Sequence, residues 1–194
     1  MTRSNLVSIK RSFVSAPFSV NNSWSGASFN FTLAALPNYT EFTNLFEQYR
    51  INAVKLTFIP SADGIDFNQQ QSNSSAGGNW ATIPRLYTAI DKDGNAQVAS
   101  ENAVLQYGNH RIIRSPLRPF SIYVKSPCVQ VGTANLVTLV GGAPKSRQWL
   151  DCDNYSVQHW GCVVGGIVPY TSATSPSIGY QVIATYYMQF KNVV

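Results

Sequence analysis

The chain has 194 residues, enough for one domain with a sizeable core, and only 12% of them are charged while another 12% are aromatic. A formal charge of +5 favours a polyanionic partner over acidic-substrate chemistry. No apolar run is long enough for a signal peptide or a membrane span, so we expect no membrane insertion, and three cysteines argue against a disulfide framework.

The first 48 residues predict two strands and a short helix. Alternating apolar residues predict strands over residues 5–14 and 28–34. Within residues 36–48, Phe42, Leu45 and Phe46 have helical spacing behind Thr40, the expected N-cap. One or two helical turns are therefore predicted before the next strand.

The strand from Tyr49 to Ile59 is rich in β-branched and aromatic residues and ends at Pro60. Its apolar residues change sides between Ala53 and Val54. Because side chains in a strand alternate with a period of two, this change predicts a β-bulge or a change of neighbouring strand. Strands with such corners are typical of sandwiches and barrels.

The middle of the chain alternates short strands with loops. A polar loop is predicted over residues 61–79 and a Gly-containing turn over residues 91–95. Residues 99–107 predict a short helix. Further strands are predicted at residues 83–91, 109–114, 120–126, 136–140 and 155–165.

The last strand, residues 180–190, has the clearest alternation. One face carries only apolar residues: Tyr180, Val182, Ala184, Tyr186, Met188 and Phe190. About eight strands with long loops and almost no helix predict an all-β fold, a single eight-stranded antiparallel jelly-roll sandwich with long loops. We expect residues 1–194 to form one domain.

A search for catalytic or metal-binding motifs finds none. His110 and His159 have no metal-ligand spacing, and we expect them to be structural or surface residues. Asp151 and Asp153 could hold a cation, but a solvated loop is the better interpretation. No nucleophile elbow or phosphate-binding loop occurs. The sequence therefore predicts no enzyme, no catalytic residue, no metal and no cofactor.

The distribution of charge is the clearest functional signal. Residues 102–150 hold six basic residues and no acid, and residues 1–40 hold three basic residues and no acid. Aromatic residues such as Tyr123 and Trp149 are interleaved with the first set, as in surfaces that hold phosphates and stack bases. Scattered solvated charges and core aromatics are the alternative. The candidate nucleic-acid-binding residues are Arg3, Lys10, Arg11, Arg50, Lys55, Arg111 and Arg114.

Two segments resemble the coat proteins of circoviruses, cycloviruses and related circular single-stranded DNA viruses. They are FEQYRINAVKLTFIP at residues 46–60 and YQVIATYYMQFKNVV at residues 180–194. The positions that match the family are Phe46, Glu47, Tyr49, Arg50, Ile51, Val54, Lys55, Phe58, Pro60, Tyr180, Tyr187, Gln189 and Phe190.

The resemblance implies a capsid protein that self-assembles as sixty copies into a T=1 icosahedral shell around a circular single-stranded DNA genome. It implies a virion protein that enters the host nucleus during assembly. The family's arginine-rich N-terminal arm is absent or truncated here, because only Arg3, Lys10 and Arg11 lie near the start. A host-surface glycan is a further partner that the resemblance suggests, although Asn52 and Ala53 are uncharged where some relatives are basic.

Two alternatives stay open. The coat protein of a small RNA or satellite virus would share the jelly roll and the shell, and phosphate contacts would not distinguish the two nucleic acids. A β-sandwich carbohydrate-binding, lectin-like module would instead place Trp24, Trp80 or Trp149 in an exposed groove.

Overall fold

The computed structural model describes residues 6–61, 83–92, 98–130, 144–168 and 177–193. Within these ranges all strand pairs are antiparallel and the helices are single turns. The strands are β1 (Val7–Val20), β2 (Ser25–Phe31), β3 (Phe46–Pro60), β4 (Arg85–Ile90), β5 (Arg111–Ile113), β6 (Phe120–Lys125), β7 (Cys128–Gln130), β8 (Pro144–Ser146), β9 (Leu150–Asp151), β10 (His159–Ile167) and β11 (Ile178–Val193). The helices are η1 (Leu33–Ala35), α1 (Tyr39–Thr43), α2 (Glu101–Leu105) and η2 (Cys152–Asn154).

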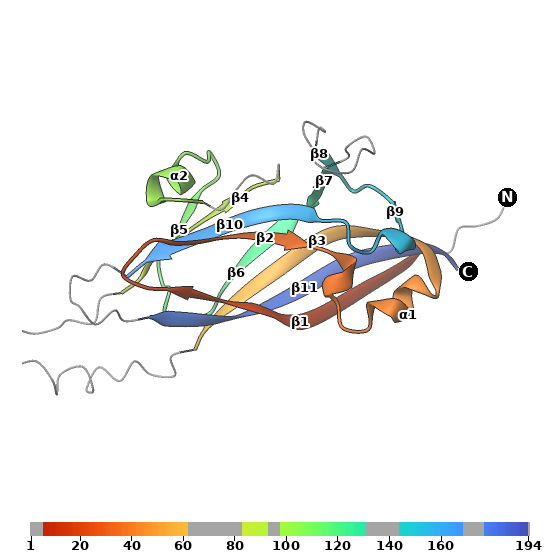
Figure 1. Cartoon of the computed structure of the whole chain (residues 1–194), viewed down its shortest axis with the longest axis horizontal. Helices are drawn as coiled ribbons and strands as arrows, with labels where there is room; N and C mark the ends of the chain where they lie inside the picture. The colour runs from red at the N-terminus through yellow and green to blue at the C-terminus, as the bar shows by residue number, and fades with distance from the viewer. Residues whose placement is uncertain (1–5, 62–82, 93–97, 131–143, 169–176, 194) are drawn as a thin grey trace, which may run out of the picture.

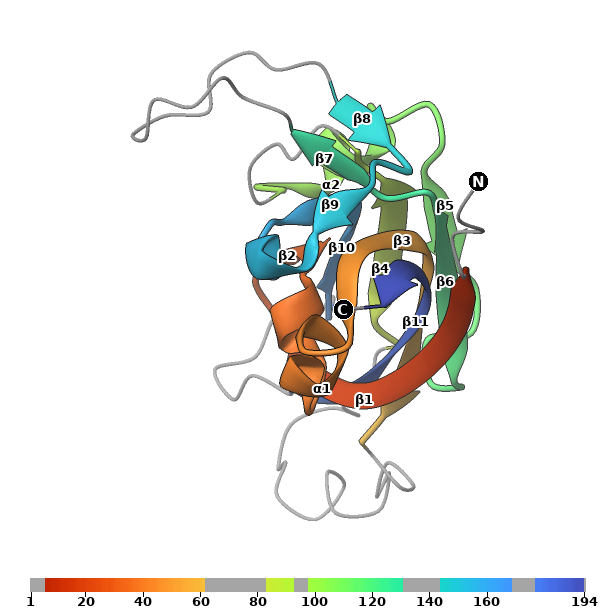
Figure 2. The same ribbon diagram turned by 90° about the vertical axis from the view of Figure 1, so that its right-hand side faces the viewer.

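Two sheets pack face to face as a sandwich (Figures 1 and 2). The first sheet has the order β1-β11-β3-β6, and β9 also pairs with β3. In the second sheet β5, β4 and β10 are neighbours, β2 pairs with β10, and β7 and β8 continue the sheet. Eight of these strands, all except β7, β8 and β9, have jelly-roll connectivity. The predicted all-β antiparallel jelly roll is confirmed, with three short additional strands in the described part of the chain.

The C-terminal strand β11 lies in the middle of the first sheet. It pairs with β1 from Val7↔Phe190 to Val20↔Ile178, and with β3 from Phe46↔Val193 to Pro60↔Tyr180. The six apolar residues predicted to share a face are all at most 2% exposed. The sequence interpretation of this strand is confirmed, because a strand with neighbours on both edges and a core on one side needs that alternation.

Strand β3 shows both features that its change of apolar phase predicted. Ala53 pairs with Tyr187 and Ile51 pairs with Met188, so Asn52 is an extra residue and forms a bulge. On its other edge β3 pairs first with β9, through Gln48 and Tyr49, and then with β6. The bulge also turns the Asn52 carbonyl outward, where it accepts a hydrogen bond from the Ser126 backbone N–H at 2.8 Å.

The core between the sheets is built largely from aromatic rings. The Phe58 ring stacks on Phe120 with 4.8 Å between centroids and meets Phe18 and Phe29 edge to face. A second cluster lies on the outside of the other sheet, where α2 covers part of β4 and β10. The second sheet is therefore covered on both faces near α2.

Three details differ from the sequence interpretation. β1 continues to Val20 because its register shifts between Ser15 and Phe18, which accommodates Pro17. Thr40 as the N-cap of α1 is wrong: Asn38, at φ 59°, precedes the helix and makes no side-chain cap. The strand predicted at residues 136–140 and most of the loop predicted at residues 61–79 lie outside the described residues.

Candidate nucleic-acid interface

The outward positions of β1, β11, β3 and β6, here called the open face, form regular rows across the sheet. Side chains alternate along each strand, so the residues next to the buried ones point outward. The strand register places them side by side. The rows are Ser8–Gln189–Arg50, Lys10–Tyr187–Ala53–Lys125, Ser12–Thr185–Lys55–Tyr123 and Val14–Ile183–Thr57–Ser121.

The open face is accessible, whereas α2 and Trp24 pack against part of the other sheet's outer side. Lys10, Lys55 and Lys125 are all exposed. The shorter polar side chains mostly bond to each other, as in the 2.9 Å contact between the Ser12 and Thr185 hydroxyls. The lysines therefore project above a flat polar layer.

Five cations occupy the outward positions of these four strands, and one acid, the exposed Asp151 of β9, ends the row of Lys191 and Gln48. Four of the cations belong to the rows above, and the fifth, Lys191, is in register with Gln48. They are Lys10, Arg50, Lys55, Lys125 and Lys191. A surface on which cations outnumber acids in this way attracts polyanions, and such binding is driven by the release of condensed counterions.

Hydrogen bonds and ring contacts fix the cations at one end of the open face. Arg50 donates from Nε and Nη2 to Oε1 of Gln189, at 2.9 and 2.6 Å, and Gln189 Nε2 donates to the Ser8 hydroxyl at 3.2 Å. The Arg50 guanidinium and the Lys191 ammonium each lie 4.6 Å from the centre of the Trp149 ring. Trp149 is thus half-buried beneath cations, not open in a groove as a sugar-binding tryptophan would be.

The structure brings three of the seven candidate residues together on this face, namely Lys10, Arg50 and Lys55. Arg11 points the other way from Lys10, and its guanidinium lies 5.6 Å from the centre of the Phe42 ring of α1. Arg111 begins β5 in the other sheet and Arg114 follows that strand. Arg3 lies outside the described residues.

Two cations of the open face, Lys125 and Lys191, are not among the seven candidates. Lys191 lies on the polar side of the last predicted strand, and Lys125 alternates with the buried Ile122 and Val124. Both were therefore detectable as outward strand positions. The sequence could not show that these strands are neighbours of β3.

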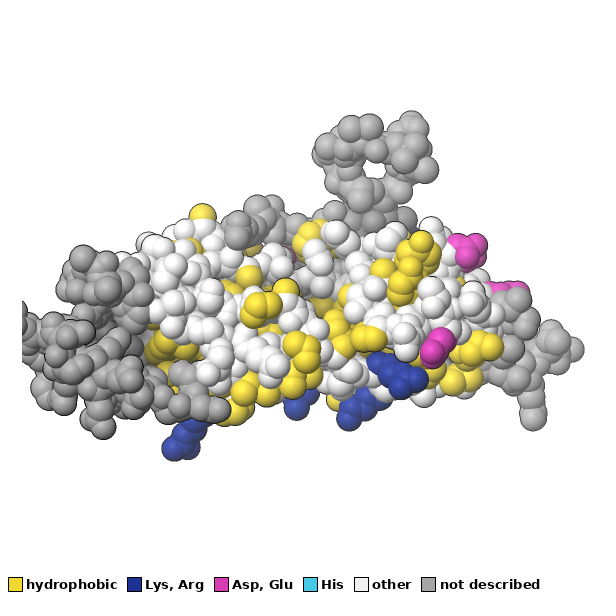
Figure 3. Space-filling model, turned by 60° about the horizontal axis from the view of Figure 1, so that its bottom comes forward, with side chains coloured by type: hydrophobic (Ala, Val, Ile, Leu, Met, Phe, Trp, Pro, Cys, Tyr) yellow, Lys and Arg dark blue, Asp and Glu magenta, His cyan; other side chains and the backbone are white. Residues whose placement is uncertain are grey.

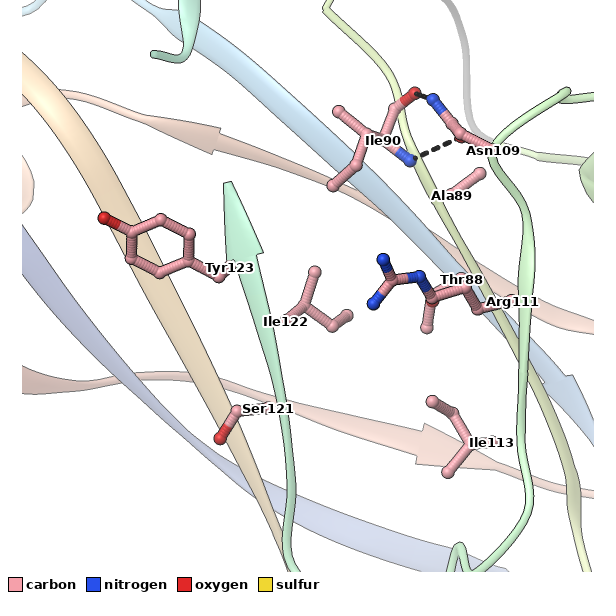
Figure 4. Close-up of a pocket in the computed structure, with 9 residues that line it drawn as sticks. All are labelled: Thr88, Ala89, Ile90, Asn109, Arg111, Ile113, Ser121, Ile122 and Tyr123. Carbon is pink, nitrogen blue, oxygen red and sulfur yellow. Dashed lines mark hydrogen bonds between the residues drawn. The ribbon is translucent and has the colours of Figure 1, made fainter. Parts of the chain in front are cut away.

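A pocket of about 350 Å³ opens between β5 and β6, the free edge strands of the two sheets (Figure 4). The Arg111 side chain extends into it toward Ile122, and Asn109 is held by hydrogen bonds to the backbone N–H and C=O of Ile90. Tyr123 also lines the pocket, and its ring lies on the opposite side of β6 from Ile122. Arg111 is thus separated from the lysines by strand β6.

The buried titratable groups have structural roles. His159 is 2% exposed, and its Nδ1 donates to the carbonyls of Phe31 and Val157 at 3.2 and 3.1 Å. Burial lowers the His159 pKa to about 4, so the ring is neutral. Among the described residues, no three His, Cys, Asp or Glu side chains gather as metal ligands would.

The exterior carries few charges (Figure 3). On the face brought forward there, uncharged polar and apolar side chains predominate, Lys and Arg lie along one border, and Asp and Glu lie toward one end. A surface depleted in charge is typical of the cores of protein–protein interfaces. No helix in the described ranges has the length and apolarity that crossing a bilayer requires.

Solved structures with the same fold are viral coat proteins. The 60-mer BFDV capsid protein superposes with a TM-score of 0.61 at 18% identity, covering 98% of this chain and 94% of that one. The decameric BFDV capsid protein gives a TM-score of 0.56 at 17% identity, covering 98% of this chain and 100% of that one. The structure of Mud crab tombus-like virus gives a TM-score of 0.57 at 11% identity, covering 100% of this chain and 84% of that one. These likenesses show the fold.

The sequence itself identifies the family. No curated protein matches the chain. The family described as Circovirus capsid protein matches residues 2–194, almost the whole sequence. The chain therefore belongs to the circovirus capsid protein family.

Proposed function

We propose that about sixty copies of this chain assemble into a T=1 icosahedral shell, as its resemblance to circovirus coat proteins implies. The observation that carries the proposal is the family match over residues 2–194. The fold shared with a BFDV protein solved as a 60-mer supports it. So does a composition with only 12% charged residues, because large contact areas between copies need uncharged surface. The role is structural: the chain is a component of the virion and performs no catalysis.

We further propose that the open face binds the genome inside the shell. Five cations against one acid suit a phosphate backbone, and Lys10, Lys55 and Lys125 lie in the part of the face that holds no acid. The family resemblance indicates circular single-stranded DNA, with assembly in the host nucleus.

Attachment to a host glycan is proposed as a second polyanion contact. Sulfated sugars would use the same kind of cations as phosphates do, but on the outside of the shell. Heparin binding by intact, purified particles would support this contact. Heparin binding only by dissociated chains would instead assign the cations to the interior.

Particle size is the first test of assembly. We expect uniform particles in the megadalton range by light scattering and negative-stain microscopy, with the ratio of absorbance at 260 and 280 nm reporting enclosed nucleic acid. A monomer or dimer under all salt conditions would contradict the shell and would favour the lectin-like alternative.

Charge removal tests the open face. Replacing Lys55 and Lys125 by Gln should weaken binding of a single-stranded oligonucleotide and reduce the slope of log K against log salt by about 1.4, at about 0.7 per phosphate contact. Lys145→Gln is the matched control, because Lys145 is exposed on β8 of the other sheet. Equal effects of the control and the double variant would refute a localised interface.

A further inference from the structure

Two tyrosines lie close together in the middle of the open face. Tyr123 on β6 and Tyr187 on β11 approach across β3, with 6.1 Å between ring centroids and 64° between ring planes. Ala53, in the same row as Tyr187, is the small residue between them, and it is only 3% exposed because its neighbours close over it. Edge-to-face contact across a small residue brings the two rings together as adjacent, differently inclined aromatic surfaces.

Packing does not explain the position of Tyr123. Its side chain is 55% exposed, whereas Ile122 and Val124 on either side supply the contacts to the core. The ring lies on the opposite side of β6 from Ile122 (Figure 4), and the pairing of Tyr123 with the exposed Lys55 places it on the open face. A large aromatic ring that stays accessible on a sheet face is available to a ligand.

Three lysines surround the pair. Lys10 Nζ lies 5.8 Å from the centre of the Tyr187 ring. In the strand register Lys55 is opposite Tyr123, and Lys125 is opposite Ala53. A phosphate chain running across these rows would meet a cation on each side of the two rings.

We propose that Tyr123 and Tyr187 form a stacking platform for the bases of single-stranded nucleic acid, with Lys10, Lys55 and Lys125 holding the neighbouring phosphates. This inference rests on the proposed genome binding at the open face. Bases of a single strand are free to stack on aromatic side chains, whereas those of a duplex already stack on each other. The platform therefore selects single strands, which the lysines alone would not do.

The test compares a short fluorescein-labelled oligodeoxythymidylate with a duplex of the same length. Binding is measured on the full chain, at concentrations below those at which light scattering detects particles. Tyr123→Leu keeps an apolar side chain without a π face, and Tyr123→Phe keeps the ring. We expect the Leu variant to bind the single strand about five- to tenfold more weakly, the Phe variant to bind like the unmodified chain, and duplex binding to be unchanged by both.

A second measurement locates the contact directly. An oligonucleotide containing 5-iododeoxyuridine crosslinks on irradiation to a ring that stacks on the base. Mass spectrometry of the digested complex should place the crosslink at Tyr123 or Tyr187. Lys55→Gln should weaken the binding of the single strand and of the duplex alike, because a phosphate contact does not depend on the bases.

The outcomes separate the platform from genome binding. If Tyr123→Leu lowered the affinity for both probes equally, or for neither, the stacking platform would be refuted and the proposed basic interface would not be affected. Unchanged oligonucleotide binding with failed shell assembly would assign the rings to a contact between copies, which also overturns it. If the unmodified chain bound neither probe at low salt, genome binding at the open face would fail and the platform with it.

Discussion

The guanidinium of Arg50 lies 4.6 Å from the centre of the Trp149 indole, and this contact joins the segment before β9 to strand β3. Trp149 directly precedes β9, which pairs with β3 through only two residue pairs, Gln48↔Asp151 and Tyr49↔Leu150. Lys191 of β11 lies at the same distance from the ring. The indole therefore anchors the segment before β9 to the centre of the first sheet.

Replacing Trp149 by Ala should lower the free energy of unfolding by about 1–2 kcal/mol, since each of two cation–π contacts contributes about 0.5–1 kcal/mol at a partly exposed site. Trp149→Phe, which keeps a smaller π face, should lose less. Urea denaturation followed by circular dichroism measures both. Equal losses in the two variants would contradict the cation–π explanation, because Phe keeps a π face for the two cations.

Gly165 should not tolerate a side chain. A Cβ at this position would overlap the indole ring of Trp24, whose Nε1 is fixed by a 2.7 Å hydrogen bond to the Val98 carbonyl. Gly165→Ala should destabilise the chain by about 1–3 kcal/mol, as overpacking in a filled core does. Gly108→Ala is the matched control, because no atom lies within 4 Å of its added Cβ. Thermal unfolding of the two variants should therefore give clearly different midpoints.

Acid should destabilise the folded chain through His159. Burial lowers the pKa of His159 from its ordinary value of 6.5 to about 4, so the unfolded chain takes up the proton first as the pH falls. The stabilisation by the neutral ring is complete above pH 6.5 and is lost progressively between about 6.5 and 4. The difference of about 2.5 between the two pKa values corresponds to about 3 kcal/mol in the free energy of unfolding.

The measurement is the free energy of unfolding as a function of pH, compared with His159→Gln, which cannot titrate. The interval from pH 6.5 to 5 is the most informative, because ordinary carboxyl groups titrate lower. We expect a flatter profile in the variant over this interval. Parallel profiles would show that His159 is not the group responsible.

The three cysteines should be unreactive in the folded chain. Cys128, Cys152 and Cys162 are buried free thiols, and burial raises the pKa of Cys152 to about 11 and that of Cys162 to about 12. Thiol-specific reagents at neutral pH should therefore modify none of them until denaturant is added, and then all three. Rapid labelling of the native chain would contradict this burial.

The strands with strict alternation were predictable, and the reason is physical. β11 has a core on one side and an accessible face on the other, so its pattern shows both its extent and its orientation. The phase change between Ala53 and Val54 likewise predicted a bulge or a change of neighbour in β3, and the structure has the bulge at Asn52. β1 was predicted only as far as Val14, because Pro17 interrupts a pattern that a register shift restores.

The open face was predictable only in part. Arg50 and Lys55 were named from one strand, but their relation to Lys125 and Lys191 depends on which strands pair. Sequence periodicity gives the side of a strand on which a residue lies and not its neighbour in the sheet. The contact between Tyr123 and Tyr187 could not be anticipated, because it depends on the register of both strands with β3.

The position of β11 has a consequence for how the chain matures. The strand that separates β1 from β3 follows all the other described strands in the sequence, and Val7 has no partner on β11 until Phe190 has been synthesised. The first sheet therefore cannot close before β11 has been made, and pairing over such sequence separations is slow. A prematurely terminated chain would lack the strand that joins the two halves of this sheet. Synthesis of β11 is therefore the step that allows the two halves of the first sheet to become one surface.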